Sequence, residues 1–445
     1  MSRIRAALSR SLTKSHPAVR LTVLAVVVLV LVAAGFMIVQ AGAPTSTPNV
    51  QSSLAPARTA SPQGTASPQG TTSPQGTSPP VSIAADCSAD VSAALNRWIA
   101  SVPDNSTITF PAGACYLVPA SIRVEDRNGL TFDGNDATFK RTKPSPPKLS
   151  YPNSNPYWWI LGGSDITLNR MSIVGVNTKS DLDLGSAVGA YKVAYEFEAA
   201  VRAEDTRGFV ADRIIVDAVW GDGFQLQGGD GATITNSKIS RNGRQGITGA
   251  DISNIELAYN TITLSRRAGI DLENNIASDV VSGVEIHHNT IGSVHLSLAA
   301  GGPGAVNGVY FHDNTVTTSG VPFIYNDRKF EGAVRRHDWR IEDNVVQEEL
   351  GSPMAAILMN NTDNITITGN TVPIKGFWDG MKPTDRRPVD LLNSAGRLIV
   401  RNNDFRGGRI SYFADSSTGS VDACGNKLTA GGEFDRPTPC SGGSP

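Results

Sequence analysis

Residues Ile341–Val346 read IEDNVV, and the same pattern recurs through the C-terminal three quarters of the chain. An apolar residue, two polar residues, an asparagine, one variable residue and a second apolar residue follow one another. The pattern occurs at Leu257–Ile262, Ile286–Ile291, Phe311–Val316, Ile341–Val346, Ile367–Val372 and Val400–Phe405. Its asparagines, Asn260, Asn289, Asn314, Asn344, Asn370 and Asn403, are 29, 25, 30, 26 and 33 residues apart. A period of 20–50 residues indicates a fold built from stacked repeats.

Looser copies extend the repeat in both directions. They are LNRMSI at Leu168–Ile173, VADRII at Val210–Ile215, ITNSKI at Ile234–Ile239 and ACGNKL at Ala423–Leu428, with Met171, Arg213, Ser237 and Asn426 in the asparagine place. Asparagine suits a bend that stacks on the bend of the next coil, because its amide can bond along the stack and it tolerates left-handed backbone. We therefore predict an all-β domain at residues 83–440, a right-handed parallel β-helix of about ten coils.

Three segments precede this domain. Residues 1–20 are basic, residues 21–40 are apolar, and residues 41–82 are rich in Pro, Ser, Thr, Gln and Gly, which predicts a linker. The uncharged run Leu21–Val39 suits a spanning helix of about 20 residues. The small residues Ala41-Gly42-Ala43 suit cleavage of a signal peptide instead. Both readings, a single-pass membrane anchor and a secreted protein, place the domain on the extracellular side of the cell envelope.

The start and end of the domain carry further signals. A helix is predicted at Ser88–Ser101, with Ser88 as its cap, and it would cover the open edge of the first coil. The four cysteines are Cys87, Cys115, Cys424 and Cys440. An even number in an exported chain suggests disulfides. Of the three pairings, the local one joins Cys87 to Cys115 and Cys424 to Cys440; free buried thiols are the alternative.

The net charge bears on the partners of the chain. Residues 1–43 carry five basic residues and no acid, so the rest carries about −2 − 5 = −7. A mildly acidic body argues against nucleic acid as the main partner and is compatible with a polysaccharide. Because each coil pairs with the next, open strand edges are confined to the two ends, and we expect a monomer.

Four segments resemble the pectate-lyase-like right-handed parallel β-helix superfamily and, more narrowly, an uncharacterised actinobacterial group of secreted β-helix repeat proteins. They are PDNSTITFPAGACY (Pro103–Tyr116), WGDGFQL (Trp220–Leu226), NGRQGI (Asn242–Ile247) and RRAGIDLENN (Arg266–Asn275). The resemblance covers residues 85–430 and implies the fold. It does not imply one activity, because the superfamily holds lyases, hydrolases, epimerases and non-catalytic members.

Aligning the repeats predicts which side chains share the outer surface. The strands at 221–227, 244–250, 268–274 and 293–299 become neighbours, with their apolar residues pointing inward. One outer column is then predicted to contain Gln225, Thr248, Asp271 and His295, and the adjacent column Gln227, Glu273 and Ser297. Asp222, Arg244 and Gln245 come just before these strands, and Glu198 lies on the preceding coil.

Asp271 and Glu273 carry the sharpest chemical signal. Residues i and i+2 of a strand lie about 6.6 Å apart on one face. Two carboxylates placed in this way repel each other, so one pKa should rise. A pair with separated pKa values can serve as acid and base in the cleavage of a glycosidic bond. The alternative is a solvated strand face without a chemical role.

Arg244 and Asp222 allow several interpretations. Arg244 could act like the arginine base of β-helix lyases, with acidic neighbours holding Ca²⁺, or it could bind a uronate carboxylate. It could also be a bend residue that forms a salt bridge with Asp271 or Glu273. Asp222 in GDG echoes a polygalacturonase aspartate, but the companion motifs NTDG, GHG and RIK are absent, as are the pectate-lyase motifs.

The sequence therefore predicts an exported polysaccharide-active enzyme, either a hydrolase or a lyase. The predicted catalytic residues are Asp271, Glu273 and Arg244, and the predicted substrate-binding residues are Asp222, Gln245, Gln225, His295 and Glu198. No spacing indicates a metal site, and Ca²⁺ is expected only for a lyase. The alternative function is a non-catalytic cell-surface module that binds glycan along the same face, and analysis of the products separates the two.

Overall fold

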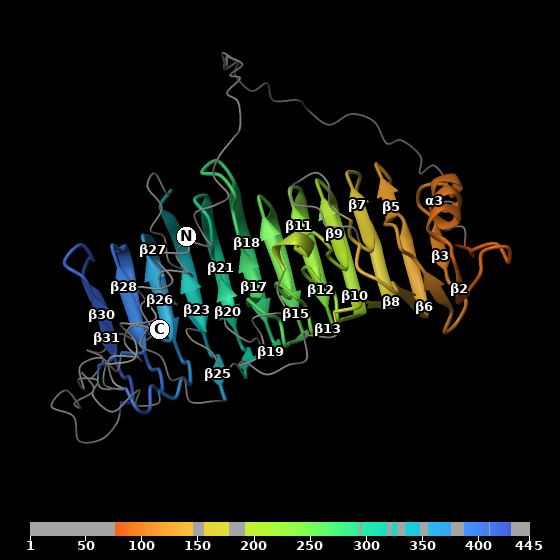
Figure 1. The fold of residues 1–445 in the computed structure, drawn as a ribbon. Helices are drawn as coiled ribbons and strands as arrows, with labels where there is room; N and C mark the ends of the chain where they lie inside the picture. The colour runs from red at the N-terminus through yellow and green to blue at the C-terminus, as the bar shows by residue number, and fades with distance from the viewer. Residues whose placement is uncertain are drawn as a thin grey trace, which may run out of the picture. The chain divides into compact units, whose positions relative to one another are not determined.

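The computed structural model describes residues 76–145, 155–177, 192–292, 296–317, 323–326, 334–347, 355–374, 387–408 and 410–428, which lie in the compact unit Thr71–Pro445. Each strand pairing within these ranges is parallel, and successive coils follow one another as rungs of a parallel β-helix (Figure 1). The predicted segments 1–20 and 21–40 lie outside the described residues. Within the described ranges, no helix is long and apolar enough to cross a membrane.

One face of the β-helix is an 11-stranded sheet, in which each strand pairs with the strand of the next coil. We call it the front sheet. Its strands, in order, are β5 (Ile122–Glu125), β7 (Trp158–Leu161), β9 (Val201–Glu204), β11 (Phe224–Gln227), β14 (Ile247–Ala250), β17 (Ala268–Leu272), β20 (Leu296–Ala299), β23 (Ile324–Asn326), β26 (Ile357–Asn360), β28 (Val389–Leu392) and β30 (Phe413–Ala414). The sequence predicted about ten coils, close to this number of rungs.

The remaining strands form a 20-stranded sheet that covers the other two faces. Near the N-terminus it contains β1 (Gly76–Thr77), β2 (Asp86–Asp90), β3 (Thr107–Thr109), β4 (Cys115–Leu117), β6 (Thr131–Lys140), β8 (Thr167–Val174) and β10 (Arg207–Asp217). Beyond β10 each coil has a longer strand, which is β12 (Asp230–Thr235), β15 (Ser253–Ala258), β18 (Val280–His287), β21 (Ala305–His312), β24 (Arg336–Glu342), β27 (Thr362–Thr368), β29 (Ala395–Arg401) or β31 (Val421–Cys424). Across a bend from the first five of these lie β13 (Lys238–Ser240), β16 (Thr261–Thr263), β19 (Thr290–Gly292), β22 (Thr315–Val316) and β25 (Val345–Val346).

The repeated asparagines occupy this bend and form a buried ladder. The side-chain oxygen of Asn370 accepts a bond from the backbone N–H of Asn344 at 3.1 Å, and the Asn344 oxygen accepts one from Asn314 at 3.0 Å. The Nδ2 group of Asn344 donates to the carbonyl oxygen of Phe311 at 2.9 Å. The same backbone bond continues from Ser237 through Asn260, Asn289, Asn314, Asn344, Asn370, Asn403 and Asn426. The ladder therefore satisfies backbone groups that the bend would otherwise leave buried and unpaired.

The left-handed backbone of this bend lies one residue earlier than predicted. Asp343 has φ 54° and His288 has φ 55°, whereas the asparagines that follow them have ordinary negative φ values. The alignment of VADRII was wrong by one residue for the same reason. Arg213, with φ 54°, takes the left-handed position, and Ile214 takes the asparagine place, where its N–H bonds to the Ser237 hydroxyl at 3.0 Å.

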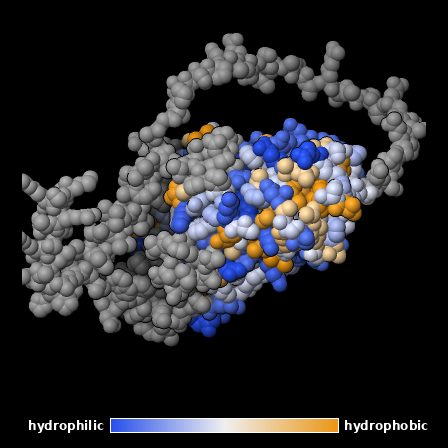
Figure 2. Space-filling model, turned by 45° about the vertical axis from the view of Figure 1, so that its right-hand side comes forward, coloured by the Kyte–Doolittle hydropathy of each residue, from blue (hydrophilic) through white to orange (hydrophobic). Residues whose placement is uncertain are grey.

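A single hydrophobic core runs through the stacked coils. Alternate residues of each strand point into it, and Phe224, Leu226 and Ile270 of the front sheet are fully buried. Trp158 packs edge-on against Phe139 with ring centres 5.0 Å apart. Outside the core, the surface turned to the viewer in Figure 2 mixes hydrophilic and hydrophobic residues where it is coloured.

The N-terminal end differs from the prediction in two places. The helix α3 (Ser92–Ser101) starts four residues later than expected, because residues 86–90 form β2 instead. Ser88 therefore does not cap it; the Asp90 carboxylate accepts bonds from Ser92 N at 2.9 Å and from its hydroxyl at 2.7 Å. The predicted linker is also wrong at its end, because β1 pairs in parallel with β3. A short 3₁₀ helix, η2 (Val193–Tyr195), precedes the front-sheet strand β9 (Val201–Glu204).

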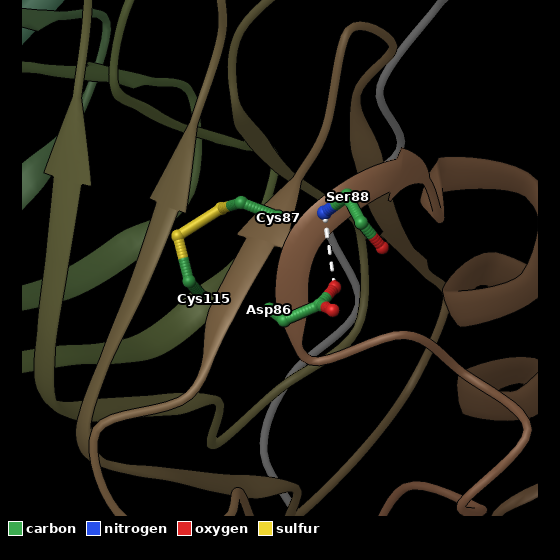
Figure 3. The surroundings of a disulfide bond; sticks show 4 residues. All are labelled: Asp86, Cys87, Ser88 and Cys115. Carbon is green, nitrogen blue, oxygen red and sulfur yellow. Dashed lines mark hydrogen bonds between the residues drawn. A yellow bond between two sulfur atoms is a disulfide. The ribbon is translucent and has the colours of Figure 1, made fainter.

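A disulfide joins Cys87 to Cys115 and links β2 to β4, two strands that pair with each other (Figure 3). Their Cα atoms are 5.0 Å apart, which is usual for a disulfide. Beside it the Asp86 carboxylate accepts a bond from the backbone N–H of Ser88 at 3.0 Å. Cys424 is disulfide-bonded as well. Because Cys440 lies outside the described residues, its pairing stays a prediction.

Candidate functional site

The outward residues of the front sheet form a continuous column with one residue from each strand. Strand register places these residues side by side in the order Arg123, Trp159, Arg202, Gln225, Thr248, Asp271, Ala299, Tyr325, Leu358, Asp390 and Phe413. Gln225, Thr248 and Asp271 are therefore neighbours, as the alignment predicted. Glu273 follows β17 directly, and its N–H bonds to the Gly249 carbonyl at 2.9 Å, so it continues the rung.

The place beside Asp271 that the alignment gave to His295 is occupied by Ala299. Ala299 pairs with Asp271, and Leu298 pairs with the inward residue Ile270, so β20 is displaced by four residues from the alignment. The same displacement removes Ser297 from the column of Glu273. His295 itself lies outside the described residues. The alignment failed here because Leu296 and Leu298 both satisfy the apolar alternation, which leaves the register open.

Arg244 is the cation at the centre of a cluster of carboxylates. Its Nη1 atom lies 2.8 Å from an oxygen of Asp222, and its Nη2 atom donates to Glu273. Glu196, at the end of η2, lies 3.9 Å from Nε of Arg244. Burial alone would lower the pKa of Arg244, but these carboxylates outweigh it and hold the pKa well above its usual value. Arg244 is thus permanently protonated and already paired.

Asp222 and Gln245 are the buried residues that hold the cluster together through hydrogen bonds. Asp222 is fully buried and accepts bonds from the Gln245 backbone N–H at 2.9 Å and from the Thr248 hydroxyl at 3.0 Å. Gln245, also fully buried, donates its Nε2–H to an oxygen of Asp271 at 2.5 Å. Burial raises the pKa of Asp222, and Arg244 and these donors oppose the rise. Three coils are therefore tied together beneath Asp271.

The two acids of β17 and its extension have pKa values displaced in opposite directions. Burial first, and the charge of Glu273 second, raises the pKa of Asp271 to about 7. Burial also acts to raise the pKa of Glu273, but Arg244 and Arg267 outweigh it and leave that pKa below its usual value. Near neutral pH the site therefore holds one carboxyl that exchanges its proton and one that stays ionised.

Glu198 belongs to a separate buried cluster. Its carboxylate accepts bonds from the backbone N–H and the hydroxyl of Ser145, each at 2.7 Å, and lies 3.9 Å from Nη1 of Arg141. Burial raises the pKa of Glu198. Glu198 lies on the coil before Asp222, as predicted, and its carbonyl oxygen accepts a bond from the Gly221 N–H at 3.1 Å. Its carboxylate, however, contacts Ser145 and Arg141 and does not extend the cluster around Arg244 within the described residues.

The coil before Asp222 adds polar residues that the sequence interpretation missed. Arg202 is fully buried in the outer column, and its Nε lies 3.0 Å from Glu204. It also donates to the side-chain oxygens of Gln227 at 2.9 Å and Gln225 at 3.5 Å. The Trp159 indole N–H donates to Glu204 at 3.1 Å. Aligning VRAE at 201–204 with FQLQ at 224–227 would have found this extension.

The same carboxylates bear on metal binding. Within the described ranges, no group of three or more His, Cys, Asp or Glu side chains is placed to hold a metal ion. The carboxylates of the cluster converge on the Arg244 guanidinium, which occupies the position a cation would take. The donor set therefore does not fit Ca²⁺.

Comparison with known proteins agrees with the fold. Residues 191–372 match the family model described as a right-handed β-helix region. No curated protein matches the chain. Among solved structures, a hyperthermoactive exopolygalacturonase from Thermotoga maritima is similar, with 11% identity, a TM-score of 0.50, and 80% of this chain and 92% of that chain covered.

Two further structures are similar at lower TM-scores. A GH87 α-1,3-glucanase from Streptomyces thermodiastaticus has 12% identity, a TM-score of 0.48, and coverage of 81% of this chain and 69% of that chain. PfbA, a surface adhesin of Streptococcus pneumoniae, has 10% identity, a TM-score of 0.47, and coverage of 79% and 92%. The narrower likeness to an actinobacterial group stays a prediction. The matched region and the parallel rungs show that the chain has the right-handed parallel β-helix fold.

Proposed function

We propose that this chain hydrolyses glycosidic bonds in a polysaccharide, with Asp271 as the general acid and Glu273 as the carboxylate that acts as base or nucleophile. The observation that carries the proposal is the opposite displacement of their two pKa values on one outward rung. Glycoside hydrolysis needs a protonated carboxyl to assist the leaving oxygen and an ionised carboxylate on the sugar's other side. Burial and Arg244 supply this difference here.

The state of Arg244 favours hydrolysis over a lyase reaction. A lyase base must accept a proton from the sugar ring, so its pKa has to lie near the working pH. The pKa of Arg244 is held well above its usual value by Asp222, Glu273 and Glu196. We therefore assign Arg244 to positioning: it keeps Glu273 ionised and fixes its orientation. Asp222 and Gln245 support this arrangement from below.

The site is open to solvent on the side of Glu273. The Glu273 and Glu196 side chains are 27% and 23% exposed, whereas Asp222 is fully buried. A polysaccharide lying along the outer column would meet Gln225 before and Ala299 after Asp271. The Thermotoga exopolygalacturonase has the same fold, and that likeness concerns the fold alone.

The test is incubation of the full chain with a panel of neutral and acidic polysaccharides. The full chain is needed, because a truncation after the predicted linker would remove β1 from its pairing with β3. New reducing ends without unsaturated sugars support hydrolysis. Unsaturated products would show a lyase and overturn the roles given to Asp271 and Arg244. Binding without any product would favour the non-catalytic glycan-binding alternative.

A further inference from the structure

We propose that the site selects an uncharged, hydroxyl-rich glycan and rejects chains of uronic acids. This inference rests on the proposed function and names its substrate class. It is carried by the balance of charge around Arg244, by one buried acceptor without a donor, and by the pairing of the cations along the outer column.

Carboxylates outnumber the cations that act on them in the cluster. Four carboxyl groups surround Arg244, and they belong to Asp222, Glu273, Glu196 and Asp271. Two cations act on Asp271 and Glu273, namely Arg244 and Arg267. With Asp271 left out of the count, three carboxyl groups remain beside these two cations, and they belong to Asp222, Glu273 and Glu196. A uronate would add a further negative charge at close range and be repelled.

The hydrogen-bonding groups point to the same class of ligand. Oε1 of Gln245 is a buried acceptor without a hydrogen-bond donor among the described residues. An unpaired buried acceptor is costly, so a ligand that offers donors gains affinity there. Sugar hydroxyls are donors, whereas a uronate carboxylate brings two more acceptors. The unmatched oxygen of Gln245 therefore favours a hydroxyl over a carboxylate.

The other cations of the outer column are already paired as well. Arg202 lies 3.0 Å from Glu204. At the ends of the sheet, Arg123 of the column pairs with Glu125, and Arg387, just before β28, lies 2.6 Å from the column residue Asp390. Binding a uronate bidentately to any of these arginines would require breaking an existing ion pair.

The rung beyond Asp271 carries small outward residues. Its outward residues are Ala299, which pairs with Asp271, and Gly301. A Cβ atom at Gly301 would lie 3.7 Å from Oδ1 of Asp271 and 3.6 Å from Cγ of Glu273, an ordinary contact distance. No charged side chain stands at these two positions. This rung therefore offers a site for substitution that tests the electrostatic argument directly.

Binding to the Asp271→Asn variant of the full chain tests the proposal without turnover. Asparagine keeps the uncharged state of the carboxyl, so the charge of the site is that of the working enzyme. Neutral gluco-, galacto- and manno-oligosaccharides are compared with uronic acid oligomers of equal length by calorimetry. We expect at least one neutral series to bind about tenfold more tightly at low salt, a difference of about 1.4 kcal/mol. The difference should shrink as salt rises.

A charge introduced beside the acids gives the complementary test. Gly301→Lys should improve binding of uronic acid oligomers about tenfold, and Gly301→Gln, which adds a side chain without charge, should leave the preference unchanged. Equal or tighter binding of uronic acid oligomers to the Asp271→Asn variant would overturn the inference. If the unmodified chain hydrolyses a uronic acid polymer fastest, the inference fails while the proposed function stands. If no glycan is bound or cleaved, both fail.

Discussion

The asparagine bend and the front sheet are built from the same coils, yet they differ in how they use polar side chains. At the bend, one residue type repeats and satisfies the backbone of its neighbour, as when Asn344 accepts from Asn314 and donates to Phe311. On the front sheet, neighbouring rungs carry Gln225, Thr248 and Asp271, which do not repeat.

This difference shows that the polar residues of the bend stabilise the fold, whereas those of the front sheet form the candidate site. Each bend would leave a backbone group unpaired, and the same residue type, asparagine, pairs with it in successive coils. This repetition is visible in the sequence. A site needs different groups on adjacent rungs, such as the protonated Asp271 beside the ionised Glu273. Substitutions confined to the bend should therefore affect stability, and substitutions confined to the site should affect activity.

Removal of the acid pair should have the largest effect. Glu273→Gln and Asp271→Asn should each lower kcat/KM by about 10²–10⁴-fold, because each removes one partner in proton transfer. The measurement is release of reducing ends from the best polysaccharide of the panel. Glu256→Gln in β15, an exposed glutamate of the other sheet, is the matched control and should retain full activity. Retention of more than a tenth of the activity in both variants would place the site elsewhere.

Breaking the asparagine ladder should affect stability and spare the chemistry. Asn344→Ala leaves the Asn314 N–H and the Phe311 carbonyl without their partner, at a cost of about 3 kcal/mol in the free energy of unfolding. Urea unfolding followed by circular dichroism measures this loss. The adjacent Asp343→Asn, which keeps a residue tolerant of φ 54°, should change stability by less than about 0.5 kcal/mol. A ladder variant as stable as the control would contradict the account.

The pH dependence of activity should report Asp271. The general acid must be protonated, so kcat/KM should fall about tenfold per pH unit above pH 7. On the acidic side, activity should persist to below the usual glutamate range, because Arg244 and Arg267 keep Glu273 ionised. A pH profile of initial rates measures both limbs. An alkaline limb that survives in Asp271→Asn would belong to another group.

The free energy of unfolding should also depend on pH through Asp271, and it should fall as the pH rises. The folded chain holds the Asp271 proton up to pH 7, whereas the unfolded chain releases it near pH 3.8. Below pH 3.8 both states hold the proton, and the contribution of this group to stability is fully present. It is lost as pH rises from about 4 to 7. Urea unfolding across this range should show a slope that is smaller in Asp271→Asn; an unchanged slope would argue against the raised pKa.

A surface variant beside the ladder should have the smallest effect. Arg340 is half exposed, lies 4.0 Å from the Tyr310 ring centre and pairs with Glu342 at 2.7 Å. Exposed pairs of this kind contribute about 0.2–1 kcal/mol. Arg340→Gln should therefore lower the free energy of unfolding by less than about 1 kcal/mol and leave activity unchanged. A loss as large as that in Asn344→Ala would show that the ladder is not the dominant polar feature of the coil.

The sequence predicts well what repeats. The asparagine ladder and the neighbourhood of Gln225, Thr248 and Asp271 follow from aligning the coils. The alignment fails where the repeat is less regular. At Ile214 an apolar residue stands in the asparagine place, so no polar residue identifies the position. In β20 the apolar residues are compatible with two registers. A two-residue strand such as β1 has no pattern of its own and gains its partner only in the stack.

The sequence predicts which residues form the candidate site better than it predicts their protonation. The alignment brings Asp271, Glu273 and Arg244 together, but the direction of each pKa depends on burial and on which oxygen faces which guanidinium nitrogen. Those contacts depend on side-chain conformations, which the repeat does not encode. Glu196 and Glu198 illustrate this point, although they are only two residues apart. The Glu196 carboxylate approaches Arg244, whereas the Glu198 carboxylate contacts Ser145 and Arg141.

The most direct test of the central claim is the titration of Asp271 in the folded chain. Infrared difference spectra between the unmodified chain and Asp271→Asn, recorded from pH 4 to 9, isolate the carboxyl stretch of this residue. The account predicts a protonated carboxyl band that disappears with a midpoint near 7. A midpoint below pH 5, close to an ordinary aspartate, would contradict the claim that burial and Glu273 keep Asp271 protonated for catalysis.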